Sequence, residues 1–130
     1  MNKGHKGQGF RRRLGYAWQG LRSAWRLEAS LRTHAAATVA LIGVLALTRA
    51  PALWWAVMAL TVAAVVSCEL INTALEALAD HLHPAQHPAI GLTKDVAAAA
   101  VLVCSLASLA VAVAFAVGHL WPWWQSRPFG

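Results

Sequence analysis

The sequence predicts an all-α membrane protein, made of an amphipathic surface helix followed by three transmembrane helices. Hydrophobic residues make up 58% of the chain and charged residues only 12%, about half the charged share of a soluble domain. A soluble protein of 130 residues cannot bury so much apolar surface, whereas a bilayer can accept it. The length provides for one domain, residues 1–130, which lies wholly at or in the membrane.

The basic residues are concentrated at the start of the chain. Eight of the eleven Lys and Arg residues lie before residue 33, where the first long apolar run begins. The positive-inside rule then places the N-terminus in the cytoplasm, and anionic headgroups account for the basic segment. Because the membrane explains the net charge of +6, we expect no nucleic-acid partner.

The N-terminal third predicts a tail and a surface helix. Residues 1–9 are rich in Gly, Lys, His and Gln and predict a disordered tail. Over residues 11–31, apolar side chains recur at three- and four-residue steps between arginines: Leu14, Trp18, Leu21, Trp25 and Leu31. This spacing is typical of an amphipathic helix that lies on a membrane surface.

Three apolar runs are long enough to cross a bilayer, at residues 33–50, 52–79 and 96–120. Tryptophans mark their outer ends, where aromatic side chains favour the headgroup level: Trp54, Trp55, Trp121, Trp123 and Trp124. Residues 80–95 are expected to form a polar cytoplasmic loop, and Pro122 is expected to end the third helix. The C-terminus then lies outside.

Ionisable residues inside the second span indicate where chemistry takes place. Inserting each one into a membrane costs about 2.5–3.5 kcal/mol of free energy, so we expect each to have a structural or functional role. At about 100° per residue, Glu69, Asn72, Glu76 and Asp80 project from one stripe of a helix. Such residues can also join helices by hydrogen bonds, but three acids and an asparagine on one stripe favour a functional site.

The stripe has the composition of a phosphate-transfer site. Neighbouring carboxylates repel unless a cation joins them or some are protonated, and Mg²⁺ prefers a few carboxylates together with substrate phosphates. A remaining carboxylate in a partly dry setting can act as general base. Lys94, beside Asp95 at the cytoplasmic mouth of the third span, supplies a cation for phosphate oxygens. The sequence therefore predicts Mg²⁺, a cytoplasmic phosphorylated nucleotide and a membrane substrate.

The histidines and cysteines point less clearly to chemistry. His81, His83 and His87 could bind zinc, but interleaved prolines and the lack of a nearby cysteine favour ordinary headgroup-level histidines. Cys68 and Cys104 both sit inside apolar segments, without a CxxC motif or a disulfide framework. We interpret both as small residues of membrane helices.

Three segments resemble the bacterial integral-membrane diacylglycerol kinases, a family that also includes undecaprenol kinases. They are GYAWQGLRSAWRLEASLR (15–32), CELINTALEALAD (68–80) and KDVAAAAVL (94–102), and the resemblance runs from about residue 10 to 120. It implies a homotrimer in the bacterial inner membrane, with active sites shared between subunits. It also implies Mg²⁺-dependent transfer of the ATP γ-phosphate to a lipid hydroxyl.

The resemblance also implies roles for individual residues. Glu69 matches the catalytic base, which also contacts the lipid, and Glu28 and Glu76 match the Mg²⁺ ligands. The residues that match nucleotide contacts are Tyr16, His87, Lys94 and Asp95, together with Glu28 and Glu76. Those that match the supporting polar cluster are Asn72 and Asp80. Those that match lipid contacts are Trp18, Arg22, Ser23, Trp25 and Arg32. Every acid of this chain falls on one of these positions.

Three positions depart from the family pattern and bear on the lipid acceptor and the nucleotide. Gly9 replaces an arginine, and Ala85 replaces an acidic residue. His34 stands where the diacylglycerol branch tends to have glutamate, and is more like the undecaprenol branch. The surface-helix segments look more like the diacylglycerol branch, so diacylglycerol is the first expectation and undecaprenol the alternative.

Two alternative interpretations, from other functional classes, compete with a lipid kinase. A small proton-coupled transporter needs one central carboxylate that is accessible from both sides of the membrane. Here the acids crowd toward the cytoplasmic end, together with Lys94, Asp95 and Glu28. A non-catalytic membrane subunit has no use for Glu28 on a surface helix. Both interpretations account for fewer of the charged residues than the lipid-kinase interpretation does.

Overall fold

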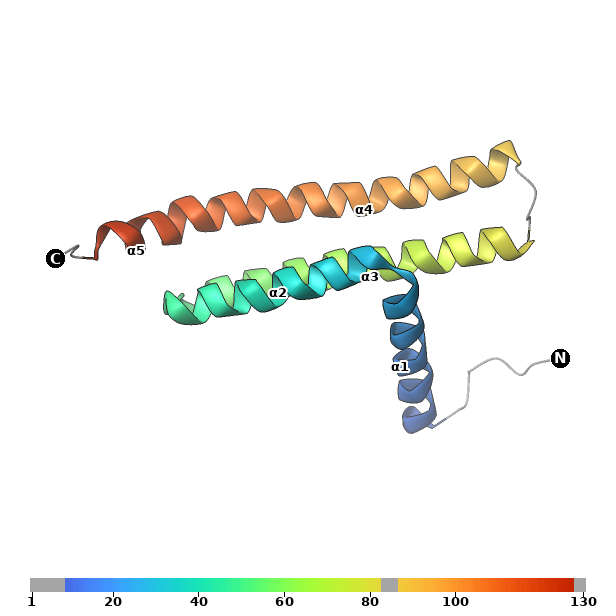
Figure 1. The fold of residues 1–130 in the computed structure, drawn as a ribbon, viewed down its shortest axis with the longest axis horizontal. Helices are drawn as coiled ribbons and strands as arrows, with labels where there is room; N and C mark the ends of the chain where they lie inside the picture. The colour runs from blue at the N-terminus through green and yellow to red at the C-terminus, as the bar shows by residue number, and fades with distance from the viewer. Residues whose placement is uncertain (1–8, 83–86, 128–130) are drawn as a thin grey trace.

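A computed structural model describes residues 9–82 and 87–127 of the chain. Its elements are α1 (Phe10–Leu27), α2 (Ala29–Leu47), α3 (Ala52–Leu82), α4 (Pro88–Phe115), the π-helical segment η1 (Ala116–Leu120) and α5 (Trp121–Gln125). α2 and α4 run in the same direction, α3 runs antiparallel to both, and α1 lies across them (Figure 1). Three of the helices are long and apolar enough to cross a membrane. The all-α membrane class is confirmed.

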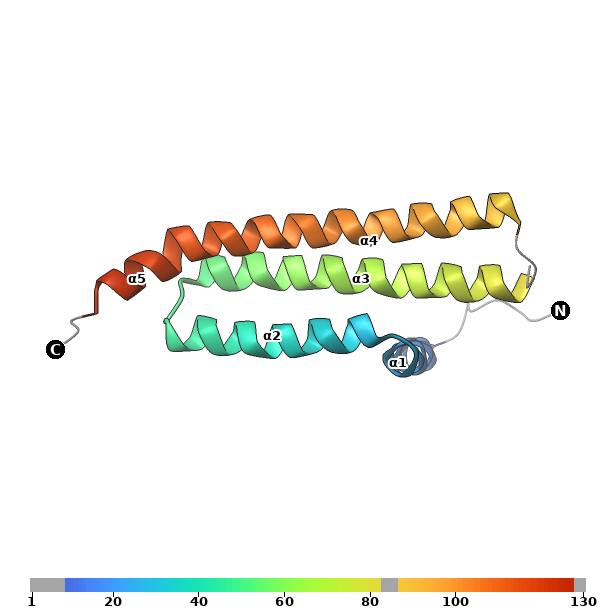
Figure 2. The ribbon, with the colours of Figure 1, turned by 45° about the horizontal axis from the view of Figure 1, so that its top comes forward.

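α3 is the central rod of the three. It packs against both α2 and α4, and it lies between them in Figure 2. Even so, at most 17% of the most apolar stretch of any spanning helix is buried within the chain. Most of the apolar surface of the three spanning helices is therefore not covered by the rest of the chain.

The break between α1 and α2 lies at Glu28, so the predicted surface helix over 11–31 is too long. Glu28 adopts an extended backbone, with φ −106° and ψ 116°, and α2 begins at the next residue rather than at residue 33. Leu31, predicted on the surface helix, is buried in α2 and only 4% exposed. The apolar spacing continues across the bend, and for this reason periodicity alone does not reveal it.

The predicted polar loop over 80–95 is mostly helical. α3 extends to Leu82 and α4 begins at Pro88, with His87 as N-cap, whose Nδ1 accepts a hydrogen bond from Ala89 N at 3.2 Å. Proline in the first turn of a helix is favoured because no hydrogen-bonding N–H is required there. Residues 83–86 and residues 1–8 of the predicted tail lie outside the described residues.

A buried apolar cluster lies where α2 ends and α3 begins, against the end of α4. Leu45, Ala50, Met58 and Phe115 form a buried cluster. Beyond it the third spanning helix does not end at Pro122 as predicted, because η1 and α5 continue it to Gln125. A π-helical turn interrupts the ordinary hydrogen-bond ladder, and Pro122 lies in the first turn of α5.

Candidate active site

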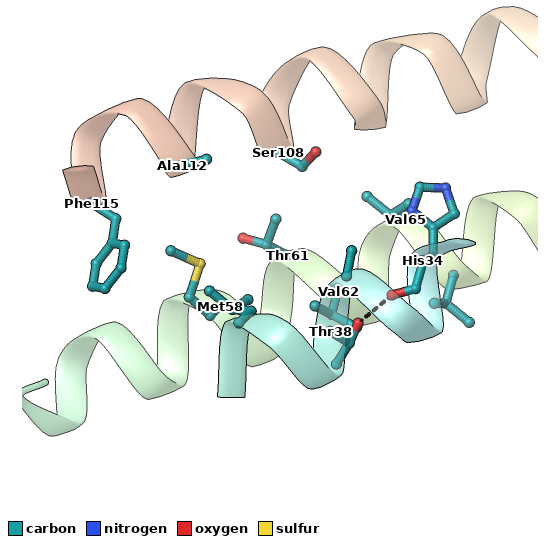
Figure 3. A pocket seen from close by; sticks show the side chains of 12 residues that line it. His34, Thr38, Met58, Thr61, Val62, Val65, Ser108, Ala112 and Phe115 are labelled. Atoms are coloured by element: carbon teal, nitrogen blue, oxygen red, sulfur yellow. Dashed lines mark hydrogen bonds between the residues drawn. The ribbon is translucent and has the colours of Figure 1, made fainter. Parts of the chain in front are cut away.

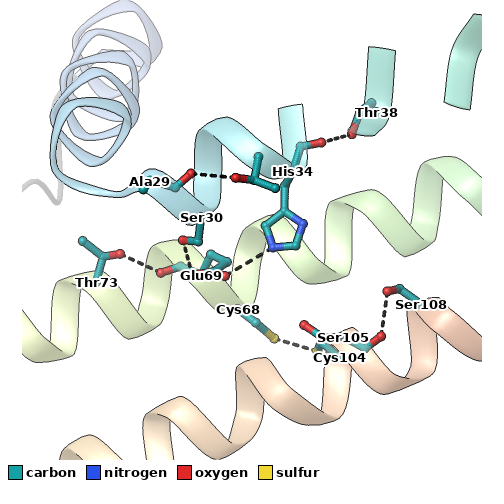
Figure 4. Close-up of polar contacts among 11 residues, drawn as sticks. Ala29, Ser30, His34, Thr38, Cys68, Glu69, Thr73, Cys104, Ser105 and Ser108 are labelled. Atoms are coloured by element: carbon teal, nitrogen blue, oxygen red, sulfur yellow. Dashed lines mark hydrogen bonds and ion pairs between the residues drawn. The ribbon is translucent and has the colours of Figure 1, made fainter. Parts of the chain in front are cut away.

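Glu69 is a buried carboxylate of α3 whose two oxygens each have a partner on α2. Its residue exposure is 8%. Ser30 Oγ donates to Oε2 at 3.1 Å, and His34 Nε2 lies 3.3 Å from Oε1 (Figure 4). A buried carboxylate is costly unless hydrogen bonds satisfy it. The α2–α3 contact therefore holds this acid in a defined position.

The start of α2 adds a favourable field at the same carboxylate. Ser30 is the second residue of α2, so the Glu69 carboxylate lies beside the N-terminal turn of that helix. The positive end of a helix dipole stabilises a nearby anion. The hydrogen bonds and the helix N-terminus thus act on the same carboxylate, which is held where a general base could work.

Asn72 and Glu76 form a second polar pair along α3. Asn72 Nδ2 donates to Glu76 Oε1 at 3.1 Å, and both residues are half-buried. Asn72 Oδ1 is buried and has no hydrogen-bond partner among the described residues. A buried carbonyl oxygen without a donor is unusual in proteins, so this pair offers oxygen atoms that a cation can use.

Asp80 and Lys94 join the ends of α3 and α4. Lys94 Nζ donates to Asp80 Oδ1 at 2.8 Å, and the two side chains are 35% and 66% exposed. The residues of the stripe predicted along α3 therefore contact two different helices: Glu69 contacts α2, and Asp80 contacts α4. None of the described hydrogen bonds joins the Glu69 carboxylate to Asn72, Glu76 or Asp80.

Glu28 lies at the bend between α1 and α2, not within the surface helix. Its side chain is half-buried and makes no capping hydrogen bond, so the carboxylate is not committed to the helix end. Within the described part of a single chain, no three His, Cys, Asp or Glu side chains gather closely enough to hold a metal ion. The oxygens of Glu28, Glu76 and Asn72 nonetheless match the ligand chemistry of Mg²⁺.

The predicted lipid-contacting residues of α1 are on its open surface. Trp18, Arg22, Ser23 and Trp25 are all exposed, as a helix in the headgroup layer requires. Arg32, from α2, donates from Nη1 to the Trp25 carbonyl oxygen at 2.9 Å. This bond joins the last turn of the surface helix to the start of the first span.

The predicted nucleotide-contacting residues are not gathered within one chain. Tyr16 lies on α1, whereas His87, Lys94 and Asp95 lie before or in α4. Among the described residues α1 packs on α2 and α3 but not on α4. One chain therefore presents two separate parts of the predicted nucleotide site.

A cavity of about 270 Å³ lies between α2, α3 and α4, with His34 at one end and Phe115 at the other (Figure 3). Its hydroxyl groups are turned to backbone carbonyls: Thr38 to His34, Thr61 to Val57 and Ser108 to Ser105. The rest of the lining is mainly aliphatic. The cavity suits a hydrocarbon chain rather than a polar ligand.

Sequence reasoning missed Ser30 and the contact between His34 and Glu69. Residues 30 and 34 share one face of a helix because they are four apart. No sequence pattern states which α3 residue that face meets. The proximity of Cys68 and Cys104, with Sγ atoms 2.9 Å apart on α3 and α4, was missed for the same reason.

The chain matches the family model described as prokaryotic diacylglycerol kinase over residues 15–116. It is 31% identical to the diacylglycerol kinase of Escherichia coli (strain K12) over 95 residues, 73% of this chain and 78% of that one. The diacylglycerol kinase of Synechocystis is 37% identical over 97 residues, 74% of this chain and 55% of that one. The undecaprenol kinase of Bacillus subtilis is 32% identical over 93 residues, 72% and 76% of the two chains.

Proposed function

This chain belongs to the prokaryotic diacylglycerol kinase family, and we propose that it transfers the γ-phosphate of ATP to the hydroxyl of diacylglycerol, giving phosphatidic acid. The observation that carries the proposal is Glu69, a buried acid with a donor at each oxygen, set in an apolar membrane helix. A lipid kinase needs such a base at membrane depth, whereas helix association alone does not.

In the proposed reaction, Glu69 accepts the proton of the lipid hydroxyl as its oxygen attacks the γ-phosphorus. The bond between that phosphorus and the β–γ bridging oxygen breaks, and ADP leaves with the electron pair. Phosphoryl transfer depends mainly on positioning and on neutralising charge. The fixed Glu69 carboxylate would position the lipid hydroxyl for the attack.

Glu28 and Glu76 would hold Mg²⁺, with the Asn72 amide beside Glu76. The bound ion supplies charge neutralisation of the nucleotide phosphates. Lys94 is bound by Asp80, which lies one turn of α3 beyond Glu76, and would exchange this partner for a phosphate oxygen. Tyr16, His87 and Asp95 complete the proposed nucleotide contacts.

A complete site needs more than one chain in this proposal. α1 does not meet α4 within the described chain, and most of the spanning surface is open. A homotrimer in the bacterial inner membrane, with its N-termini in the cytoplasm, would place α1 of one subunit against α4 of the next. Shared sites would then form at each subunit interface.

The acceptor lipid is proposed to place its chain in the apolar cavity that ends at His34. Its hydroxyl then reaches the level of Glu69, because His34 contacts both the cavity and the carboxylate. Diacylglycerol is the first candidate, since two of the relatives named above are diacylglycerol kinases. Undecaprenol is the second candidate, supported by the Bacillus subtilis relative and by the histidine at position 34.

The test is a transfer assay with purified protein in mixed micelles. γ-Labelled ATP and Mg²⁺ are supplied with diacylglycerol, with undecaprenol, or with both in equal amounts. We expect label in both lipids and a higher initial rate for diacylglycerol. Faster labelling of undecaprenol would reverse the order of the two candidates, and label in neither lipid would refute the kinase proposal.

A further inference from the structure

We propose that Ser30 and His34 are positioning residues, which hold the Glu69 carboxylate between them and set the direction in which it meets the lipid hydroxyl. The proposal rests on the kinase activity proposed above and deepens it. It concerns residues of α2 that act through Glu69 rather than on the phosphate.

The chemistry of the contact fixes the roles of the atoms. An ionised carboxylate only accepts hydrogen bonds, so His34 must donate through Nε2–H and Ser30 through its hydroxyl. The two donors engage different oxygens, Oε1 at 3.3 Å and Oε2 at 3.1 Å. A carboxylate held at both oxygens cannot rotate freely about its terminal bond, although each oxygen keeps a lone pair for an incoming proton.

Both donors come from one turn of one helix. Ser30 and His34 are four residues apart on α2, whereas Glu69 belongs to α3 (Figure 4). The orientation of the base is therefore set by the register between these two helices. Arg32, which lies between the two donors in sequence, donates a hydrogen bond to the Trp25 carbonyl near the end of α1.

His34 also connects the base to the cavity. Its side chain is 31% exposed and lines the 270 Å³ cavity, while the Glu69 side chain behind it is only 10% exposed. A hydrocarbon chain in the cavity would touch the residue that orients the base. Occupancy of the cavity and alignment of the carboxylate are thus linked through one imidazole ring.

The test compares two substitutions of His34 with a matched control. His34→Phe keeps a planar ring but loses the donor, and His34→Gln keeps an N–H donor at a similar reach. His119→Phe makes the same chemical change at the opposite end of the bundle, where His119 contacts Thr48 and Phe115. The readouts are kcat and the separate KM values for ATP and lipid in mixed micelles.

We expect His34→Phe to lower kcat about 10- to 100-fold, the range that follows from slight misplacement of a catalytic group, with KM for ATP unchanged. His34→Gln should restore most of the rate, and His119→Phe should keep the wild-type kcat. If the wild-type protein is active, the positioning role would be overturned by an unaltered kcat in His34→Phe. It would also be overturned if His34→Gln did not recover the rate. A wild-type protein without transfer activity would instead refute the kinase proposal itself.

Ser30 provides an independent arm if His34→Phe fails to fold. Ser30→Ala removes one donor with little change in volume, and Ser30→Thr retains the hydroxyl. We expect a smaller kcat loss in Ser30→Ala than in His34→Phe, and recovery of kcat in Ser30→Thr. In the double variant of Ser30→Ala with His34→Phe, the fold-loss in kcat should differ from the product of the two single losses, because both residues act on one carboxylate. A wild-type kcat in Ser30→Ala would overturn the two-point arrangement.

Discussion

Glu69, at the α2–α3 contact, and Asp80, at the α3–α4 contact, differ in how far their carboxylates are exposed and hydrogen-bonded. Glu69 is 8% exposed and has a donor at each oxygen, whereas the Asp80 side chain is 66% exposed and accepts a hydrogen bond from Lys94 Nζ at Oδ1. Burial and fixed geometry suit a group that must meet one proton in one direction. Exposure suits groups that exchange partners when a nucleotide and a cation arrive.

Removing the charge of Glu69 should have the largest effect. Glu69→Gln keeps the shape and can still contact Ser30 and His34, but the amide cannot accept the proton of a lipid hydroxyl. We expect a rate loss of about 1,000-fold, within the range for a general base, with helical content and oligomeric state unchanged. A variant that retains more than a few per cent of wild-type turnover would remove Glu69 from the base role, as measured by labelled lipid formed per enzyme.

Lys94 and Asp80 should respond unequally to substitution. Lys94→Met removes the proposed phosphate contact and should raise KM for ATP about tenfold, the loss of one charged hydrogen bond. Asp80→Asn leaves Lys94 in place, and it should lower stability only slightly, because solvent screens an exposed ion pair. Steady-state kinetics against ATP distinguish the two, and equal KM values for Lys94→Met and wild type would rule out nucleotide contact by Lys94.

The α3–α4 packing can be tested with the native cysteines, with the smallest expected effect on activity. Cys68 and Cys104 are free thiols with Sγ atoms 2.9 Å apart. Copper-phenanthroline with oxygen should form an intrachain disulfide, detected by mass spectrometry of the digested protein, because little movement is needed. Cys104→Ser is the control, and a failure to cross-link the folded wild-type protein would contradict this helix register.

Composition and hydropathy predict the fold class and the number of spans, because an excess of apolar surface in a short chain has few solutions. They do not place the helix ends. The bend at Glu28 interrupts neither the apolar spacing nor the helix-forming composition, and Pro88 indicates a loop as readily as a first helical turn. The π-helical turn before Pro122 has no sequence signal of its own.

The candidate site was predictable in part. Glu69, Asn72, Glu76 and Asp80 stand out because charged and polar groups are costly in an apolar helix. The roles assigned to them, and to the residues implied by the family resemblance, stay predictions. Ser30 and His34 were not predictable as partners of Glu69, because the register between two helices depends on packing across the whole interface, which one sequence does not reveal.

The measurement that tests the central comparison most directly is a magnesium titration of Glu69→Gln beside Glu28→Gln and Glu76→Gln, with diacylglycerol and saturating ATP. If Glu28 and Glu76 hold the ion, their variants should need about tenfold more Mg²⁺ and regain activity at high concentration, since lost ligands weaken rather than abolish binding. Glu69→Gln should remain inactive at every Mg²⁺ concentration. Recovery of Glu69→Gln by Mg²⁺, or wild-type titrations in both other variants, would contradict the separation of base from metal ligands.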